Sequence, residues 1–317
     1  MTAKKSRLAI LAVGGNALIL DEKHRSVKDQ YAVCESTCAH IVGLVEAGYQ
    51  LVVTHGNGPQ VGFILRRSEL SRHELHEVPL DSCGADSQGA IGYQIQRAMH
   101  NHMRRWPAPP PVATVVTQTL VDRHDPSLSN PSKPIGSFMG EAEAVAHRDQ
   151  DGWSIVEDAG RGFRRVVASP RPQQIIELEV IRRLVAGGTV VVAVGGGGIP
   201  VVEEDDGSLV GLEAVIDKDL ATSLLARELK ADLLIICTAV EKVCLNYRKP
   251  DERALDRLTL AEAKQYLKEG HFAPGSMKPK IEAVIEYLEG GGREALITDP
   301  AHLVAAIKGQ AGTWIVA

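Results

Sequence analysis

Long apolar runs and an excess of basic residues are both missing from this chain. Because no apolar stretch reaches the roughly 20 residues that cross a bilayer, we expect no membrane partner. Lys and Arg number 35 against 40 Asp and Glu in 317 residues, which gives a formal net charge of −5. Clustered basic residues supply most of the affinity for nucleic acids, so this balance argues against a nucleic-acid partner.

Cysteine is also scarce, with five residues, an odd number, and no CxxC pair. Cys34 and Cys38 lie four residues apart on an expected helix, a spacing that can hold a metal ion, but reduced thiols in a cytosolic protein are the simpler interpretation. The basic N-terminus leads into an apolar run that breaks at Gly14 and Gly15, as a first strand does and a signal peptide does not. We therefore expect a cytoplasmic protein.

Apolar strand-like runs alternate with helix-like segments along most of the chain. The pattern predicts strands at residues 8–13, 50–54, 112–120, 189–194, 233–237, 295–298 and 313–316. It predicts helices at residues 27–47, 59–70, 88–100, 175–186, 220–229, 260–269 and 279–289. This alternation is typical of an α/β fold with a mostly parallel sheet and helices on both faces.

Residues 121–165 interrupt this alternation. They contain Pro126, Pro131 and Pro134 and several small polar residues, and they show no sustained helical or strand periodicity. Long irregular stretches in compact domains are usually functional or mobile. We expect a lid subdomain inserted into the main sheet domain.

Three of the predicted strands end in glycine-rich turns. The turns are residues 13–16 (Val-Gly-Gly-Asn), 55–60 (His-Gly-Asn-Gly-Pro-Gln) and 194–200 (Val-Gly-Gly-Gly-Gly-Ile-Pro). Bare backbone N–H groups at such turns can surround an anion, and ligands of parallel sheets bind at the carboxyl ends of the strands. Asn57 adds a carboxamide between two glycines at a helix start, which favours an anion there. The first turn alone is equally typical of a tight connection, whereas four successive glycines indicate close backbone approach by a ligand.

Two familiar nucleotide signatures are absent. The chain has no G-x-x-x-x-G-K-[ST] segment, so it has no P-loop. The nearest match to G-x-G-x-x-G starts at Gly56, but its third glycine, Gly62, comes one residue late. A dehydrogenase is therefore poorly supported.

Three lysines stand in settings that suit phosphoryl transfer, which needs cations placed along the line of transfer. Lys133 lies in a segment stiffened by prolines on either side, and Lys280 stands at a predicted helix start. Lys218 lies between Asp217 and Asp219, either of which could cap the following helix. A single lysine is most often a solvated surface residue, so the argument depends on all three settings together.

In combination, these motifs resemble the carbamate kinases of the amino-acid kinase superfamily. The motifs are residues 14–17, 55–62, 87–93, 130–136, 195–200, 214–219 and 271–277. They occur in matching order from near residue 8 to the C-terminus. Other members of the superfamily typically have lysine where Asn16 stands and lack the proline-flanked segment around Lys133.

The resemblance implies a homodimer and a three-layer αβα domain over residues 1–317, with a small protruding lid subdomain inserted at 121–165. It implies reversible phosphoryl transfer between ATP and carbamate, giving ADP and carbamoyl phosphate, with ATP formation as the usual direction during breakdown of arginine or another nitrogen compound. Mg²⁺ is expected as a bridge between nucleotide phosphates, with no protein cage of its own.

The resemblance also assigns residues. It implies that carbamate and the phosphoryl group lie among Gly14, Gly15, Asn16, Gly56, Asn57 and Gly58. It implies that the catalytic groups are Lys133, Lys218, Asp219 and Lys280. It implies nucleotide contacts from Gly195, Gly196, Gly197, Thr238, Ala239, Val240, Tyr247 and Met277.

One position departs from the family pattern, and two alternatives stay open. Many carbamate kinases have Asp where this chain has Ala239, which bears on nucleotide affinity more than on reaction type. A kinase of the same fold acting on another small carboxylate is one alternative, although Asn16 and the Lys133 segment count against it. A non-catalytic nucleotide-binding relative is the other, although the intact lysines argue against it.

Overall fold

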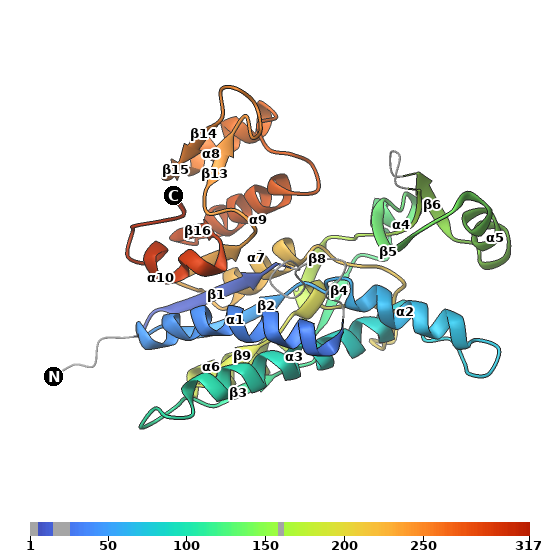
Figure 1. The fold of residues 1–317 in the computed structure, drawn as a ribbon, viewed down its shortest axis with the longest axis horizontal. Helices are drawn as coiled ribbons and strands as arrows, with labels where there is room; N and C mark the ends of the chain where they lie inside the picture. Colours follow the sequence, from blue (N-terminus) through green and yellow to red (C-terminus); the bar gives the residue numbers. More distant parts are fainter. Residues whose placement is uncertain (1–5, 15–25, 158–161) are drawn as a thin grey trace.

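A twisted eight-stranded sheet forms the centre of the computed structural model, which describes residues 6–14, 26–157 and 162–317 (Figure 1). The strand order is β15 (Arg257–Thr259), β17 (Thr313–Val316), β16 (Glu294–Thr298), β12 (Leu233–Cys237), β1 (Leu8–Val13), β2 (Gln50–His55), β9 (Val190–Val192) and β3 (Val112–Thr114). All neighbouring pairs in this order are parallel except β16 and β17. The expected mostly parallel sheet is confirmed.

Helices cover both faces of this sheet, so the domain has three layers. Ile10 of β1 joins a core cluster that includes α6 (Leu178–Ala186), α7 (Lys218–Glu228) and α9 (Met277–Glu289). The next residue, Leu11, joins the opposite cluster with α1 (Val27–Glu46) and α3 (Leu80–Met103). Because successive strand residues point to opposite faces, a doubly covered strand must be apolar throughout, as β1 is. The expected αβα architecture is confirmed.

Local sequence signals set several helix ends. Ser26 and Asp29 form a capping box at the start of α1, and Gly48, at φ +88°, follows its end. Thr259 and Glu262 form a second capping box at α8 (Leu260–Lys268). Short elements around the sheet include α10 (Leu303–Ala306) and the 3₁₀ turns at Gly195–Gly197 and Pro300–His302.

The predicted strand 112–120 is wrong as one continuous element. It divides into β3 in the central sheet and β4 (Gln118–Val121) in a second sheet of order β11-β10-β4-β8, whose other strands are β11 (Leu209–Gly211), β10 (Ile199–Glu203) and β8 (Pro172–Ile175). Thr117 makes the break: its N–H donates to Gln88 Oε1 at 2.7 Å, and its hydroxyl donates to the Val115 carbonyl at 2.7 Å. The helix predicted at 175–186 begins only at Leu178, because Ile175 belongs to β8 and pairs there with Thr119 of β4.

Residues 121–165 hold regular structure, contrary to the irregular stretch that the sequence predicts. They contain α4 (Pro126–Ser129), β5 (Lys133–Met139), α5 (Glu141–Asp151), β6 (Ser154–Glu157) and the start of β7 (Phe163–Val167). The strands form an antiparallel sheet of order β5-β7-β6, and this unit projects from the upper right of the molecule in Figure 1. The strands are stabilised by pairing with one another and bury no large apolar face, so their sequences do not show the periodicity of a larger sheet. The action of the unit as a lid stays a prediction.

A fourth, two-stranded sheet lies beyond the central sheet. It consists of β13 (Val243–Leu245) and β14 (Arg253–Leu255), which pair antiparallel. α2 (Gln60–Ser71) begins directly after the second glycine turn and runs toward the protruding unit. The second glycine turn therefore leads directly into the helix that packs against the protruding unit.

Candidate active site at the strand ends

The glycine turns come together because their strands are neighbours in register. Val13 pairs with His55 on one side and with Cys237 on the other. The N–H of Gly14 donates to the Cys237 carbonyl at 3.2 Å, and the N–H of Gly56 donates to the Val13 carbonyl at 3.1 Å. The turns after β1, β2 and β9 therefore share one edge of the sheet, as expected. Gly15 and Asn16 lie outside the described residues.

Two side chains of the second turn, those of His55 and Asn57, make hydrogen bonds that hold it. Asn57 Oδ1 accepts a hydrogen bond from Ser87 Oγ at 2.9 Å. His55 Nδ1 lies 2.9 Å from the Gly56 carbonyl, so this nitrogen carries the ring proton. Burial lowers the pKa of His55 to about 4, and the charge of Lys218 acts in the same direction. The imidazole is neutral at pH 7.

The third turn is packed against the protein itself. A Cβ on Gly195 would lie 2.5 Å from the His55 ring, and one on Gly196 would lie 1.8 Å from Asn57 Oδ1. Gly197 faces the Ile216 carbonyl in the same way, at 2.7 Å. These glycines are buried, and neighbouring residues already exclude a side chain at each of them, so packing accounts for glycine here without any ligand. Their contacts with a nucleotide stay a prediction.

Two of the predicted lysines meet on one buried carboxylate. Asp219 is 4% exposed. Lys218 Nζ lies 2.5 Å from its Oδ1, and Lys280 Nζ lies 3.3 Å from its Oδ2. The two ammonium groups come from the starts of α7 and α9, so the structure brings together residues that are 62 positions apart in the chain.

Lys133 reaches the same place from the protruding unit. Its Nζ donates to the Ile216 carbonyl at 3.0 Å and lies 3.7 Å from Asp217 Oδ2. Lys133 is the first residue of β5, and its side chain extends from there toward the start of α7. The structure thus gathers all four residues predicted to be catalytic: Lys133, Lys218, Asp219 and Lys280.

Electrostatics keeps this cluster charged. Burial by itself would raise the pKa of Asp219, but the ammonium groups of Lys218 and Lys280 outweigh burial and hold that pKa below its usual range. Burial lowers the pKa of Lys133, and the carboxylates of Asp217 and Asp219 oppose this effect. An ionised carboxylate therefore fixes the ammonium groups while each keeps N–H donors for an anion.

Asp217 settles which carboxylate caps α7. Its Oδ1 accepts from the N–H of Asp219 at 2.9 Å and from that of Leu220 at 3.3 Å. The hydroxyl of Thr222 then donates to the Lys218 carbonyl at 2.7 Å and lies 2.7 Å from Thr54 Oγ1 in β2. The cap and this pair of threonines fix Lys218 against the strand that carries the second turn.

Sequence reasoning gave no role to several residues that organise the site. Gln88 Nε2 donates to the carbonyls of Thr117 and Gly195, each at 3.0 Å, and so joins β3–β4 to the third turn. Gln88 stood in the motif at residues 87–93, but only the fold shows what it touches. His55 had no signal beyond its place in the second turn.

The residues predicted to hold adenine lie at the end of β12 and beyond. The N–H of Thr238 donates to the Thr298 carbonyl at 2.8 Å, and Ala239 is exposed. Tyr247 is exposed, with the Arg248 guanidinium 5.3 Å from its ring centre. Val240 is half-buried, and Met277 packs against the core at the start of α9. An adenine pocket formed by these residues stays a prediction.

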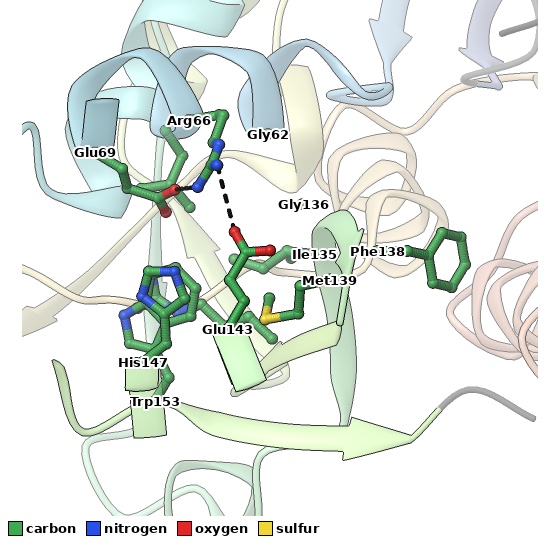
Figure 2. A pocket seen from close by; sticks show the side chains of 12 residues that line it. Gly62, Arg66, Glu69, Ile135, Gly136, Phe138, Met139, Glu143, His147 and Trp153 are labelled. Carbon is green, nitrogen blue, oxygen red and sulfur yellow. Dashed lines mark hydrogen bonds and ion pairs between the residues drawn. The ribbon is translucent and has the colours of Figure 1, made fainter. Parts of the chain in front are cut away.

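A separate cavity lies between α2 and the protruding unit (Figure 2). Arg66 bridges Glu69 and Glu143 with contacts of 3.3 Å each. His147 and Trp153 stack with ring centres 4.0 Å apart. The cavity shares β5 with Lys133, but no lysine lines it. It belongs to the contact between the protruding unit and the domain.

The model of the Amino acid kinase family matches residues 7–299. The chain belongs to this family. The Carbamate kinase-like protein YahI of Escherichia coli is 47% identical over 98% of this chain and 98% of its own length. The Carbamate kinase of Thermococcus kodakarensis is 46% identical over 97% of this chain and 98% of its own length. The structure of Carbamate kinase from Giardia lamblia bound to AMP-PNP superposes with a TM-score of 0.93, at 42% identity, covering 98% of this chain and 99% of that one.

One more distant solved structure shares the fold alone. The N-acetylglutamate synthase from Neisseria gonorrhoeae superposes with a TM-score of 0.57 at 15% identity. Within the described part of the chain, none of the helices has the length and apolar character needed to span a bilayer.

Proposed function

We propose that this chain is a carbamate kinase, which transfers a phosphoryl group reversibly between ATP and carbamate and yields ADP and carbamoyl phosphate. The observation that carries the proposal is the convergence of Lys133, Lys218 and Lys280 on the carboxylates of Asp217 and Asp219, beside the glycine turns. Relatives named carbamate kinase, at 46% identity over nearly the whole chain, support the same activity.

The chemistry needs no nucleophilic side chain. In the forward direction, a carboxylate oxygen of carbamate attacks the γ-phosphorus of ATP, and the bond from that phosphorus to the β-phosphate oxygen breaks. ADP leaves with the electron pair, and the phosphoryl group ends on the carbamate oxygen. Positioning and charge neutralisation are therefore the whole task of the protein.

The residues of the site divide that task. The backbone N–H groups of Asn57 and Gly58 would hold carbamate and the phosphoryl group in place. The ammonium groups of Lys133 and Lys218 would neutralise charge on the phosphoryl oxygens, and Lys280 would contact the nucleotide phosphates. Asp219 keeps two of these ammonium groups at fixed positions, so little reorganisation is needed as charge moves.

Mg²⁺ is part of the proposal as an ion carried by the nucleotide. In the described residues, no group of three or more His, Cys, Asp and Glu side chains is placed to hold a metal ion. The central carboxylate, Asp219, is already paired with two lysines. These residues fit a Mg²⁺ held mainly by phosphate oxygens, where it would neutralise their charge. ATP formation in the cytoplasm, a homodimeric state and a source of carbamoyl phosphate in arginine breakdown extend the same proposal.

The test is ATP formation from carbamoyl phosphate. Purified protein given ADP, Mg²⁺ and carbamoyl phosphate should form ATP in proportion to enzyme, and omission of any one of them should abolish the signal. Well-folded protein that forms no ATP would refute the proposal. Phosphorylation of N-acetylglutamate or aspartate but not of carbamate would favour the first alternative, and tight ADP binding without turnover would favour the second.

A further inference from the structure

Gln60, the first residue of α2, carries a buried carbonyl oxygen that lacks a donor. Its side chain is 7% exposed. Nε2 donates to Gln30 Oε1 at 3.3 Å, whereas Oε1 has no hydrogen-bond partner in the described part of the chain. A buried acceptor without a donor is costly, so its presence calls for a donor that the described residues do not provide.

This oxygen lies at the second glycine turn. A Cβ on Gly58 would lie 2.0 Å from Gln60 Oε1, and Gly58 has the left-handed φ of +54°. Among the described residues, the N–H groups of Asn57 and Gly58 meet no acceptor. The N–H groups in the first turn of α2 are also open, as at every helix start. One free acceptor therefore stands beside several free donors.

Neighbouring oxygens of the turn already have partners. The Gly56 carbonyl takes the ring proton of His55, and Asn57 Oδ1 takes the hydroxyl of Ser87. The Val13 carbonyl takes the N–H of Gly56. Gln60 Oε1 is thus a buried side-chain acceptor at this turn that no described residue fills.

Carbamate matches this arrangement atom by atom. Its carboxylate accepts hydrogen bonds, and its amino group donates them, whereas acetate has a methyl group in place of that donor. We propose that Gln60 Oε1 accepts a hydrogen bond from the amino group of carbamate and sets the preference for carbamate over acetate. This inference rests on the proposed carbamate kinase activity.

Gln94 supplies the matched control. It is 6% exposed, and its Oε1 also lacks a partner in the described residues. It lies on α3, about 10 Å along the helix from Ser87 at 1.5 Å per residue. A buried amide oxygen without a donor is therefore not sufficient to define a site, and the location of Gln60 beside the turn is what distinguishes it.

The experiment compares two phosphoryl donors. kcat/KM for ATP formation is measured with carbamoyl phosphate and with acetyl phosphate for the wild type, Gln60→Met and Gln94→Met. Methionine keeps the length of the side chain and removes both polar groups. We expect Gln60→Met to lower kcat/KM with carbamoyl phosphate by about tenfold or more, as the loss of a hydrogen bond does. The value with acetyl phosphate should change little, and Gln94→Met should keep the wild-type ratio.

Equal losses with both donors would overturn the inference, since Gln60 would then only support the turn; unchanged rates with both would overturn it as well. If acetyl phosphate is not turned over, its inhibition constant against carbamoyl phosphate replaces kcat/KM in the comparison. Thermal unfolding and ADP affinity confirm that each variant is folded. A wild type that forms no ATP from carbamoyl phosphate would refute the proposed function instead, a distinct outcome.

Discussion

At the scale of single residues, the site depends on buried groups whose charge states are set by their surroundings. Asp219 stays ionised because two ammonium groups contact it, whereas His55 stays neutral because the effect of burial on its pKa outweighs that of the hydrogen bond to the Gly56 carbonyl. The first group fixes cations, and the second fixes a carbonyl of the glycine turn. The ionised Asp219 and the neutral His55 serve the same purpose, which is to hold donors in place before the substrate arrives.

The neutral state of His55 predicts a pH dependence of stability. Its pKa is about 4 in the folded protein against the ordinary 6.5, so the unfolded chain binds more protons between these values. Stability should therefore fall as the pH drops through this window. The loss from this group between about pH 7.5 and pH 5 is about 2 kcal/mol. Urea unfolding of the wild type and His55→Gln at both pH values measures it, as the part of the loss that the variant lacks. A variant with the same pH dependence as the wild type would contradict the assignment.

At the scale of elements, the position of Lys133 depends on how β5 meets α2. Gly62 on α2 faces Gly136 on β5: a Cβ on Gly62 would lie 3.0 Å from the Gly136 Cα (Figure 2). Ile135 and Val167 of the protruding unit pack with Val61 and Leu65 around this contact. Lys133 lies three residues before Gly136, so the contact sets the distance from its ammonium group to the site.

Gly62→Ala should therefore reduce turnover without removing any catalytic group. The added methyl meets backbone atoms, so β5 must shift and carry Lys133 with it. We expect kcat to fall about 10- to 100-fold, as small misplacements of catalytic groups do. Gly84→Ala on α3 is the control, because a Cβ there meets nothing within 4 Å. In the Lys133→Ala background, Gly62→Ala should have no further effect; a full additional loss would show that the contact acts elsewhere.

The sequence predicted elements well where local pattern decides them. β12 runs over Leu233–Cys237 as predicted, since a short run of apolar residues directly after the charged Asp232 marks where the strand begins. The break at Thr117 could not be foreseen, because its partner Gln88 is 29 residues away. The lysines were found from their neighbours in sequence, but their meeting at Asp219 and the cap at Asp217 depend on the fold. The packing around Gly195–Gly198 could not be foreseen either, because the groups that exclude a side chain there come from distant segments.

At the scale of the whole molecule, the site is formed by two parts of the structure. The central domain supplies the glycine turns, Lys218, Asp219 and Lys280, and the protruding unit supplies Lys133. Some of the contacts between them lie at α2, where the ion pairs Arg66–Glu143 and Arg72–Asp151 link the helix and its C-cap to α5. A site assembled from two bodies is complete only when they meet, which is what the contact of Lys133 with Ile216 shows.

The most direct test of this central claim is the rate of ATP formation by Lys133→Ala from carbamoyl phosphate, ADP and Mg²⁺. Loss of a preorganised cation at the transition state costs about 10²- to 10³-fold in kcat. Lys264→Ala is the control, since Lys264 lies half exposed on α8 and pairs with Glu289 at the surface. The account predicts a loss of at least about 100-fold for Lys133→Ala and a wild-type rate for Lys264→Ala. A folded Lys133→Ala variant that works at nearly the wild-type rate would contradict it.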